Sequence, residues 1–315
     1  MYKALVIGCG NIGAQYDMHN NEIQSHVKAW YLNPLVSLHI YDINRSLVEN
    51  VADKYNCEII DSLEVDVLKE FTFVSICTPT ATHLNFLEMA LAAKVNVVIC
   101  EKPVSNNYED LEQIKSIYEI NTSKVLINYM RRFLPPFMEL KQFISSIKPF
   151  EKLTNISIRY QRGFINNCSH AFDLIAYLTD IDIDLSHINR FNLIADHFID
   201  DPTLSLQALW GDVNFNVQGL SNVNFSHFEI DLYFNYHKIV VKNAGNIIEI
   251  LKAEKTDGNL KPLILQAEHT RNNCLENYMK HVIDYAVDLK QGRVNKDNFI
   301  NAVTLNQKML RYKDN

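Results

Sequence analysis

Residues 4–13 read ALVIGCGNIG, an apolar run that passes directly into the glycine motif GxGxxG. The mainly apolar, β-branched segment 3–7 predicts a buried strand, after which the glycines permit a tight turn. At the start of a helix, such a turn lets the backbone approach a pyrophosphate closely. The alternative is a glycine turn in an α/β fold that binds no nucleotide. The residues we expect at a dinucleotide here are Gly8, Gly10, Asn11, Ile12 and Gly13.

The first half of the chain continues with alternating strand and helix patterns. Short apolar, β-rich segments are separated by stretches with apolar residues at helical spacing. This alternation is typical of a parallel sheet with crossover helices, and we expect a doubly wound Rossmann domain over residues 1–128. The further expected strands are residues 36–41, 73–77, 95–100 and 124–128, and the expected helices are 26–32, 46–54, 80–92 and 108–120.

The second half has a different pattern. Several segments alternate with a period of two residues, which predicts antiparallel strands. We therefore expect a second α/β domain, residues 129–315, with a large open, mainly antiparallel sheet that binds substrate and makes oligomer contacts. The expected strands are residues 155–160, 204–209, 214–218, 228–234 and 238–242; the expected helices are 168–178, 274–289 and 298–311, the last two packing back across the domains.

Composition excludes several classes of protein. The 315 residues are 47% hydrophobic and 21% charged, with a net charge of −7, so neither a disordered chain nor a basic nucleic-acid or membrane-surface binder is expected. No apolar stretch approaches the roughly 20 residues of a membrane-spanning helix. The six cysteines have no metal-ligand spacing, and no histidine pair suits a metal. We expect a cytoplasmic protein with reduced cysteines and no metal site.

Asp42 stands at the end of the second expected strand. A carboxylate there accepts hydrogen bonds from the adenosine ribose and repels the extra phosphate of NADP. Arg45, three residues on, is the alternative, because a guanidinium suits that phosphate. The pattern favours NAD, and the remaining interpretation of Asp42 is a helix cap.

Two further strand ends carry polar motifs. Thr78-Pro79-Thr80 with His83 follows one strand, and Glu101-Lys102-Pro103 follows the next. Ligands of open α/β sheets bind at this carboxyl edge, so Lys102 is expected to face the nicotinamide and the substrate. An isolated surface lysine is the alternative. The other cofactor contacts expected at this edge are Thr78, Pro79, His83 and Glu101.

These motifs, together with the stretch 129–133 (YMRRF), resemble the glucose-fructose oxidoreductase / inositol dehydrogenase (Gfo/Idh/MocA) family. Residues 167–174 (NCSHAFDL) resemble the family helix that faces the nicotinamide. Asn166 stands where many members have an acid. Lys102 and His170 are the candidates for acid–base chemistry on the substrate hydroxyl. We expect His170 to be the base, because its ordinary pKa suits that role, and Lys102 to hold the substrate oxygen or relay the proton. The alternatives for Asp173 are to orient His170, to bind a substrate hydroxyl or to cap the local structure. The expected substrate-binding residues are Lys102, Arg131, Arg162, Asn166, Asn167 and His170.

The resemblance implies an NAD(P)-dependent oxidoreductase. The reaction is hydride transfer between nicotinamide and a secondary hydroxyl or ketone of a sugar, nucleotide-sugar or cyclitol, with a place in carbohydrate metabolism, including bacterial surface sugars. Two alternatives stay open, an NAD-dependent glycosidase of the same fold and a non-catalytic NAD-sensing regulator. Lys102 and His170 argue against the regulator, whereas Asn166 favours it. An open sheet leaves one face to be covered, so we expect a homodimer or homotetramer.

Overall fold

The computed structural model describes residues 1–186, 188–194, 198–255 and 259–314. The chain divides into two compact units. Unit 1 comprises Met1–Phe133 and Asn277–Gln307, and unit 2 comprises Leu134–Glu276 and Lys308–Asn315. The division thus follows Phe133, and a late segment of the chain returns to unit 1. The domain limits expected from the sequence, residues 1–128 and 129–315, stay a prediction.

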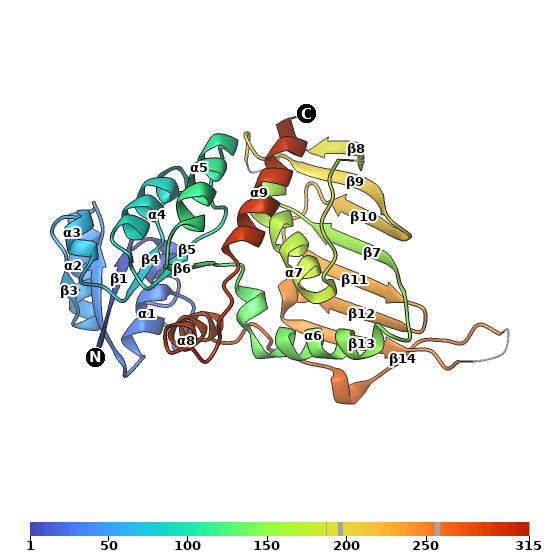
Figure 1. Cartoon of the computed structure of the whole chain (residues 1–315). Coiled ribbons are helices and arrows are strands. Elements are labelled where there is room, and N and C mark those ends of the chain that lie inside the picture. The colour runs from blue at the N-terminus through green and yellow to red at the C-terminus, as the bar shows by residue number, and fades with distance from the viewer. Residues whose placement is uncertain (187, 195–197, 256–258, 315) are drawn as a thin grey trace. The chain divides into compact units, whose positions relative to one another are not determined.

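Unit 1 contains a six-stranded sheet in the order β3-β2-β1-β4-β5-β6, with every neighbouring pair parallel. Helices alternate with these strands along the chain (Figure 1). The expected Rossmann topology is therefore confirmed. Its strands are β1 Tyr2–Ile7, β2 Val36–Tyr41, β3 Glu58–Ile59, β4 Phe73–Ile76, β5 Val97–Cys100 and β6 Lys124–Ile127.

The helices of unit 1 largely follow expectation. A short strand and a short helix, β3 and α3, fill residues for which the sequence predicted no element. The glycine loop opens into one π-helical turn, Asn11–Gln15, and α1 begins at His26, as expected. The helices are α1 His26–Tyr31, α2 Arg45–Tyr55, α3 Val65–Leu68, α4 His83–Ala92, α5 Tyr108–Glu119 and α8 Tyr278–Lys290, with 3-10 turns Thr80–Thr82 and Met130–Phe133.

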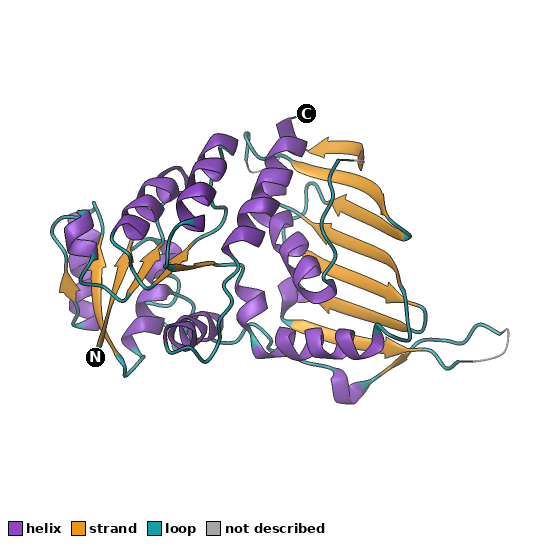
Figure 2. Cartoon of the chain, in the orientation of Figure 1, coloured by secondary structure: helices purple, strands orange, loops and turns teal. Residues whose placement is uncertain are grey.

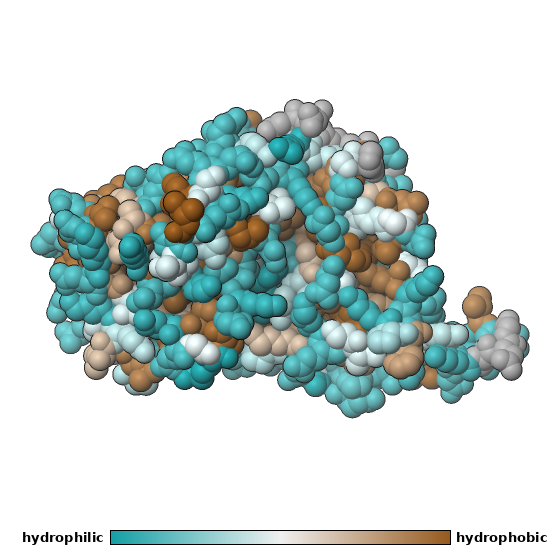
Figure 3. Space-filling model, in the orientation of Figure 1, coloured by the Kyte–Doolittle hydropathy of each residue, from teal (hydrophilic) through white to brown (hydrophobic). Residues whose placement is uncertain are grey.

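The core of unit 1 explains why these segments take their places. All four residues of β4 and of β5 are buried, as is usual for strands covered on both faces. Trp30 of α1 is fully buried, stacks at a tilt on Phe73 and donates a hydrogen bond to Ser75. The surface over α2, α4 and α5 is mainly hydrophilic, with scattered apolar side chains (Figure 3). Among the described residues, no helix combines the length and apolar character that a membrane crossing needs.

Unit 2 contains an eight-stranded sheet in the order β14-β13-β12-β11-β7-β10-β9-β8. The β7–β10 pair is parallel and the other pairs are antiparallel, so the expectation of a mainly antiparallel sheet is confirmed. The strands are β7 Leu153–Tyr160, β8 Ile188–Ile194, β9 Thr203–Trp210, β10 Val213–Gly219, β11 Phe228–Phe234, β12 His237–Lys242, β13 Ile247–Lys252 and β14 Ile264–Leu265.

One face of this sheet packs on helices α6 Pro135–Ile147 and α7 Ser169–Thr179 (Figure 2). Ile156 and Ile158 of β7 point to that face and are buried, and Phe172 of α7 contacts Phe215 of β10. The opposite face is polar, because alternate residues of β10 are exposed asparagines and a glutamine. The two-residue alternation in the sequence therefore separates a core face from a solvent face. Helix α9, Phe299–Asp314, passes from unit 1 into unit 2.

Candidate functional site

The glycine loop is built as the sequence predicts. Gly8 has φ +97°, and a Cβ on it would lie 2.8 Å from the carbonyl oxygen of Cys77. A Cβ on Gly13 would lie 2.0 Å from the carbonyl oxygen of Gly8, so the two ends of the loop are in direct contact. By contrast, apart from its two chain neighbours, none of the described residues has an atom within 4 Å of the Cβ position of Gly10. The loop is thus closely packed at both ends and open at its centre, where a pyrophosphate fits.

Asp42 lies beside this loop, directly after β2. Its carboxylate accepts hydrogen bonds from the backbone N–H of Cys9, at 2.7 Å, and of Asn44, at 2.8 Å. Asn44, not Asp42, is the N-cap of α2. The carboxylate is therefore held at the glycine loop. The nearby Arg45 forms ion pairs with Glu49, at 2.7 Å, and with Asp61, at 2.9 Å.

His83 begins α4 and is buried. Its Nδ1 lies 2.8 Å from the carbonyl oxygen of Pro103, and its Nε2 lies 2.9 Å from that of Thr78. The imidazole therefore connects the loops that follow β4 and β5. Thr78 is partly buried and Pro79 exposed, so this loop forms part of the carboxyl edge of the sheet.

The carboxylate of Glu101 is also held inside unit 1. Its Oε1 accepts hydrogen bonds from His26 Nε2, at 3.0 Å, and from Asn128 Nδ2, at 2.6 Å. Burial alone would raise the pKa of Glu101, but these hydrogen bonds and the charges of His26 and Lys102 keep that pKa below its ordinary value. Glu101 is thus ionised at neutral pH. Sequence reasoning missed His26 and Asn128, because neither belongs to a motif with a defined spacing.

Lys102 lies between these two held points. It is partly buried, follows the strand end that carries Glu101 and precedes Pro103, to which it is joined by a cis peptide bond. The segment is therefore fixed by His26 and Asn128 before Lys102 and by His83 after it. Arg131, buried, and Arg132, partly buried, lie in the 3-10 turn that follows β6.

The residues expected at the substrate in unit 2 lie at the start of α7. The segment Phe164–Cys168 forms a π-helical turn that holds Asn166 and Asn167, and α7 begins at Ser169. His170 is partly exposed, whereas Asp173, one turn further, is buried. The amide side chains of Asn166 and Asn167 donate to the carbonyl oxygens of Arg162 and Gln161. Arg162 itself is exposed.

Asp201 is a residue of this region that the sequence did not indicate. Its carboxylate accepts hydrogen bonds from the backbone N–H of Ile165 and of Asn166, both at 2.7 Å. Burial raises its pKa, although these N–H groups act in the opposite direction. Gly163, with φ +89°, faces the same carboxylate, since a Cβ there would lie 2.3 Å from Oδ2. Asp201 thus fixes the turn that leads to His170.

The expected site residues therefore form two groups. Gly8, Gly10, Gly13, Asp42 and the strand ends with Lys102 lie at the carboxyl edge of unit 1. His170, Asp173, Asn166 and Asn167 share one turn and helix start in unit 2. Each group is organised by contacts within its own unit.

A parallel Rossmann sheet with this glycine loop defines a dinucleotide-binding protein, and comparison with known proteins gives its family. Residues 2–129 match the GFO/IDH/MocA model, described as an oxidoreductase family with an NAD-binding Rossmann fold. The Rossmann domain of this chain therefore matches the NAD-binding domain of Gfo/Idh/MocA family oxidoreductases. The family expected from the sequence is thus confirmed.

Three relatives illustrate this similarity. The chain is 28% identical over 140 residues to inositol 2-dehydrogenase of Rhizobium meliloti (strain 1021), covering 44% of this chain and 39% of that protein. It is 29% identical over 103 residues to UDP-N-acetylglucosamine 3-dehydrogenase of Acidithiobacillus ferrooxidans, covering 33% and 32%. The match thus spans about two fifths or less of these relatives. A structure of levoglucosan dehydrogenase with NADH and L-sorbose superposes with a TM-score of 0.74 at 13% identity, over 99% of this chain and 96% of that one, which shows the shared fold.

Proposed function

We propose that this chain is an NAD-dependent dehydrogenase that acts on a secondary hydroxyl of a sugar, nucleotide-sugar or cyclitol. The observation that carries the proposal is the fixed segment around Lys102. Two buried histidines and an asparagine hold it at the carboxyl edge of a sheet whose glycine loop fits a dinucleotide. Relatives named for inositol, UDP-N-acetylglucosamine and levoglucosan support a polyhydroxylated substrate.

In the proposed mechanism, Lys102 holds the substrate oxygen and His170 removes its proton. A histidine has an ordinary pKa suited to general base catalysis. Asp173, one helical turn from His170, orients it, while Arg131, Arg162, Asn166 and Asn167 bind the remainder of the substrate. The nicotinamide supplies the hydride acceptor when the cofactor is bound. Lys102 and His170 belong to different units. That they act together on one substrate oxygen is therefore part of the proposal.

We further propose a preference for NAD over NADP. The Asp42 carboxylate beside the glycine loop suits ribose hydroxyls and repels an added phosphate. Arg45, the alternative phosphate ligand, is already paired with Glu49 and Asp61. Calorimetric titration with both cofactors tests the preference, and equal or tighter NADP(H) binding would contradict it.

Substituting Lys102 and His170 one at a time tests the catalytic assignment. General acid–base groups contribute about 10²–10⁴-fold in rate, so Lys102→Ala and His170→Ala should each lower kcat by that order on a substrate found by screening sugars and UDP-sugars for NADH formation. Cofactor affinity should stay unchanged, because Gly10 and Asp42 are untouched. Near-normal turnover in both variants would rule out these roles. The release of free sugar without net NADH would instead indicate a glycosidase.

A homo-oligomer is also proposed, through the polar face of the unit 2 sheet. Ser157, Asn216, Gln207 and Asn189 stand opposite one another in successive strands and line a groove of about 730 Å³. Seven strands of six to eight residues span about 800 Å², which matches one side of a standard protein interface. Light scattering should show a dimer or tetramer, and Asn216→Lys should weaken it. A wild-type monomer at micromolar concentration contradicts this proposal.

A further inference from the structure

His26 occupies a position that packing alone does not explain. Its side chain is completely buried at the first residue of α1, and its Nδ1 has no hydrogen-bond partner within the described part of the chain. A buried polar atom without a partner costs free energy, so an apolar side chain of the same size would pack there at lower cost. The favourable contact of this imidazole is the hydrogen bond from Nε2 to Glu101.

The location of His26 is itself fixed. Ser25, the N-cap of α1, is buried and bound by the fully buried carboxylate of Asp17, which accepts from the Ser25 N–H at 2.8 Å and from its hydroxyl at 2.6 Å. The imidazole of His26 therefore has little freedom to leave Glu101. A histidine held this firmly transmits its position to the carboxylate that it binds.

Glu101 is the residue through which His26 reaches the proposed site. One of its oxygens accepts hydrogen bonds from both His26 and Asn128, and the charge of Lys102 further lowers its pKa. The influence is reciprocal, so the Glu101 anion favours the ammonium form of Lys102. The other titratable groups that sense Glu101 are the thiols of Cys77 and Cys100 and the phenol of Tyr278 on α8; burial raises the pKa of each, so all three stay neutral near pH 7.

We propose that His26 is a positioning residue for Lys102. Its Nε2–H holds the Glu101 carboxylate, and Glu101 in turn fixes the backbone and the local charge at Lys102. The inference rests on the proposed function, in which Lys102 touches the substrate oxygen. It adds His26, which belongs to no recognised motif, to the residues that support that reaction.

Two substitutions of similar size separate the hydrogen bond from packing. His26→Gln keeps an N–H near the position of Nε2, whereas His26→Leu fills the space without a donor. Because small displacements of a reacting group have large effects on rate, His26→Leu should lower kcat by about 10–100-fold, and His26→Gln should restore most of the loss. Cofactor affinity should change less than about twofold in both variants, as the glycine loop is untouched.

His39 supplies a matched control. It is also a buried histidine of unit 1 with an unpartnered Nδ1, and its Nε2 lies 3.1 Å from a carboxylate oxygen of Glu58, away from the carboxyl edge that carries Lys102. His39→Leu should leave kcat unchanged. Equal losses in His26→Leu and His39→Leu, or no rescue by His26→Gln, would overturn the inference. Circular dichroism establishes folding; if His26→Leu does not fold, His26→Asn, whose amide falls short of Glu101, replaces it.

A second readout does not depend on turnover. Labelling of Lys102 with acetic anhydride over a pH series, quantified by mass spectrometry, reports when its amine becomes reactive. Glu101→Gln should move that reactivity to lower pH, because it removes the anion beside Lys102. His26→Leu removes a donor that compensates this anion and should move the reactivity to higher pH, whereas His39→Leu should leave it unchanged. If Lys102→Ala turns over normally, the proposed function fails while this coupling still stands. If the labelling profiles coincide, the inference fails even with Lys102 essential.

Discussion

The loop that carries Lys102 and the turn that precedes His170 are both rigidly held, but by different chemistry. In unit 1, side chains from sequence-distant elements hold the loop, with His26 and Asn128 on the Glu101 carboxylate. In unit 2, the Asp201 carboxylate binds the backbone of the turn itself. In both cases a motif in the sequence locates the residue proposed to react. It does not show which remote residue fixes it.

The difference has consequences for substitution. In unit 1, the side chains that hold the loop can be substituted one at a time, and each substitution should change the electrostatic field at Lys102. In unit 2, the hydrogen bonds from the turn to Asp201 depend on backbone geometry, since a Cβ on Gly163 would clash with the Asp201 carboxylate. Substitutions in that turn should affect the free energy of unfolding more than the local electrostatic field.

The largest stability effect is expected at Gly163. Gly163→Ala combines a positive φ with a Cβ 2.3 Å from Asp201 Oδ2, and the two penalties together should cost about 2–4 kcal/mol of unfolding free energy. Gly211, with φ +59° and no described residue beyond its chain neighbours within 4 Å of its Cβ position, isolates the first penalty, so Gly211→Ala should cost about 1 kcal/mol. Urea denaturation measures both.

The steric part of this prediction can be tested separately. In an Asp201→Ala background the clash with the carboxylate is absent, so Gly163→Ala should cost less than in the wild type. Equal costs in the two backgrounds would mean that Asp201 does not confine Gly163.

These positions show what the sequence could and could not predict. The parallel sheet of unit 1 followed from alternating patterns, and Gly8 and Gly13 lie where the backbone leaves no space for a Cβ. The short elements β3, β14 and α3 were missed, since two to four residues carry no periodicity. The longer elements β8, β13 and α6 were also not assigned from the sequence. The start of α1 at His26 was predicted correctly, and Asp17 and Ser25 fix it through a local hydrogen-bond network.

The site residues divide along the same line. Lys102 could be named from its place at a strand end, and His170 from the family resemblance of its helix. His26 and Asp201 could not, because their importance comes from a partner 75 or 36 positions away in the chain. Pairing across such distances is a property of the fold.

A smaller effect is expected at Asp201 itself. Asp201→Asn replaces one acceptor oxygen by an NH₂ group that faces a backbone N–H, which should cost about 1–2 kcal/mol. Burial raises the pKa of Asp201, so the folded state binds more protons than the unfolded state just above pH 3.8. The contribution of Asp201 therefore falls as pH rises through that range. Unfolding of both proteins from pH 3 to 7 should show a cost that is larger at acid pH; a cost that grows with pH contradicts the assignment.

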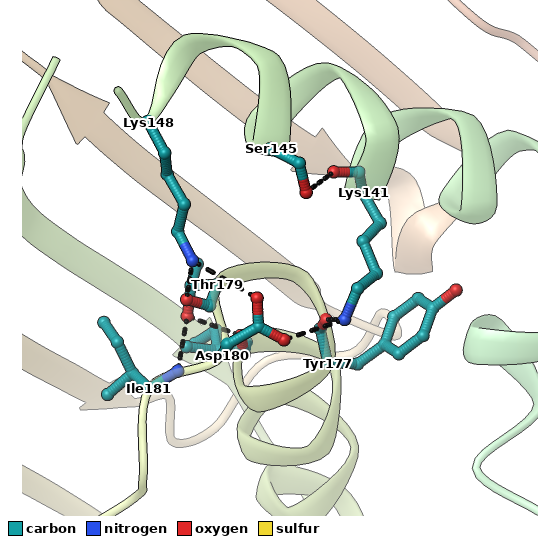
Figure 4. Close-up of polar contacts among 8 residues, drawn as sticks. Lys141, Ser145, Lys148, Tyr177, Thr179, Asp180 and Ile181 are labelled. Carbon is teal, nitrogen blue, oxygen red and sulfur yellow. Dashed lines mark hydrogen bonds and ion pairs between the residues drawn. The ribbon is translucent and has the colours of Figure 1, made fainter. Parts of the chain in front are cut away.

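The smallest effect is expected at the other end of α7, where Asp180 is held by Lys141 of α6 and by Lys148, the C-cap of that helix. Lys141 and Lys148 bind its carboxylate at 2.9 Å and 3.3 Å, and their ammonium groups also donate to the last carbonyls of the helix, those of Tyr177 and Thr179 (Figure 4). Cations at a helix C-terminus are favourable. The Asp180 side chain is 62% exposed, so Asp180→Asn should cost less than about 1 kcal/mol.

The sign of its pH dependence is opposite to that of Asp201. The hydrogen bond from Lys141 is the main cause of a lowered pKa at Asp180. The folded state then binds fewer protons than the unfolded state below pH 3.8, so the contribution of Asp180 is complete above that pH and is lost as pH falls through its folded value. The cost of Asp180→Asn should accordingly disappear in acid and shrink in 1 M salt, which screens exposed ion pairs. The Asp201→Asn cost should persist in both conditions. If salt weakens both costs equally, exposed ion pairs hold both ends of α7. The distinction between the buried hydrogen bonds of Asp201 and the surface ion pairs of Asp180 is then wrong.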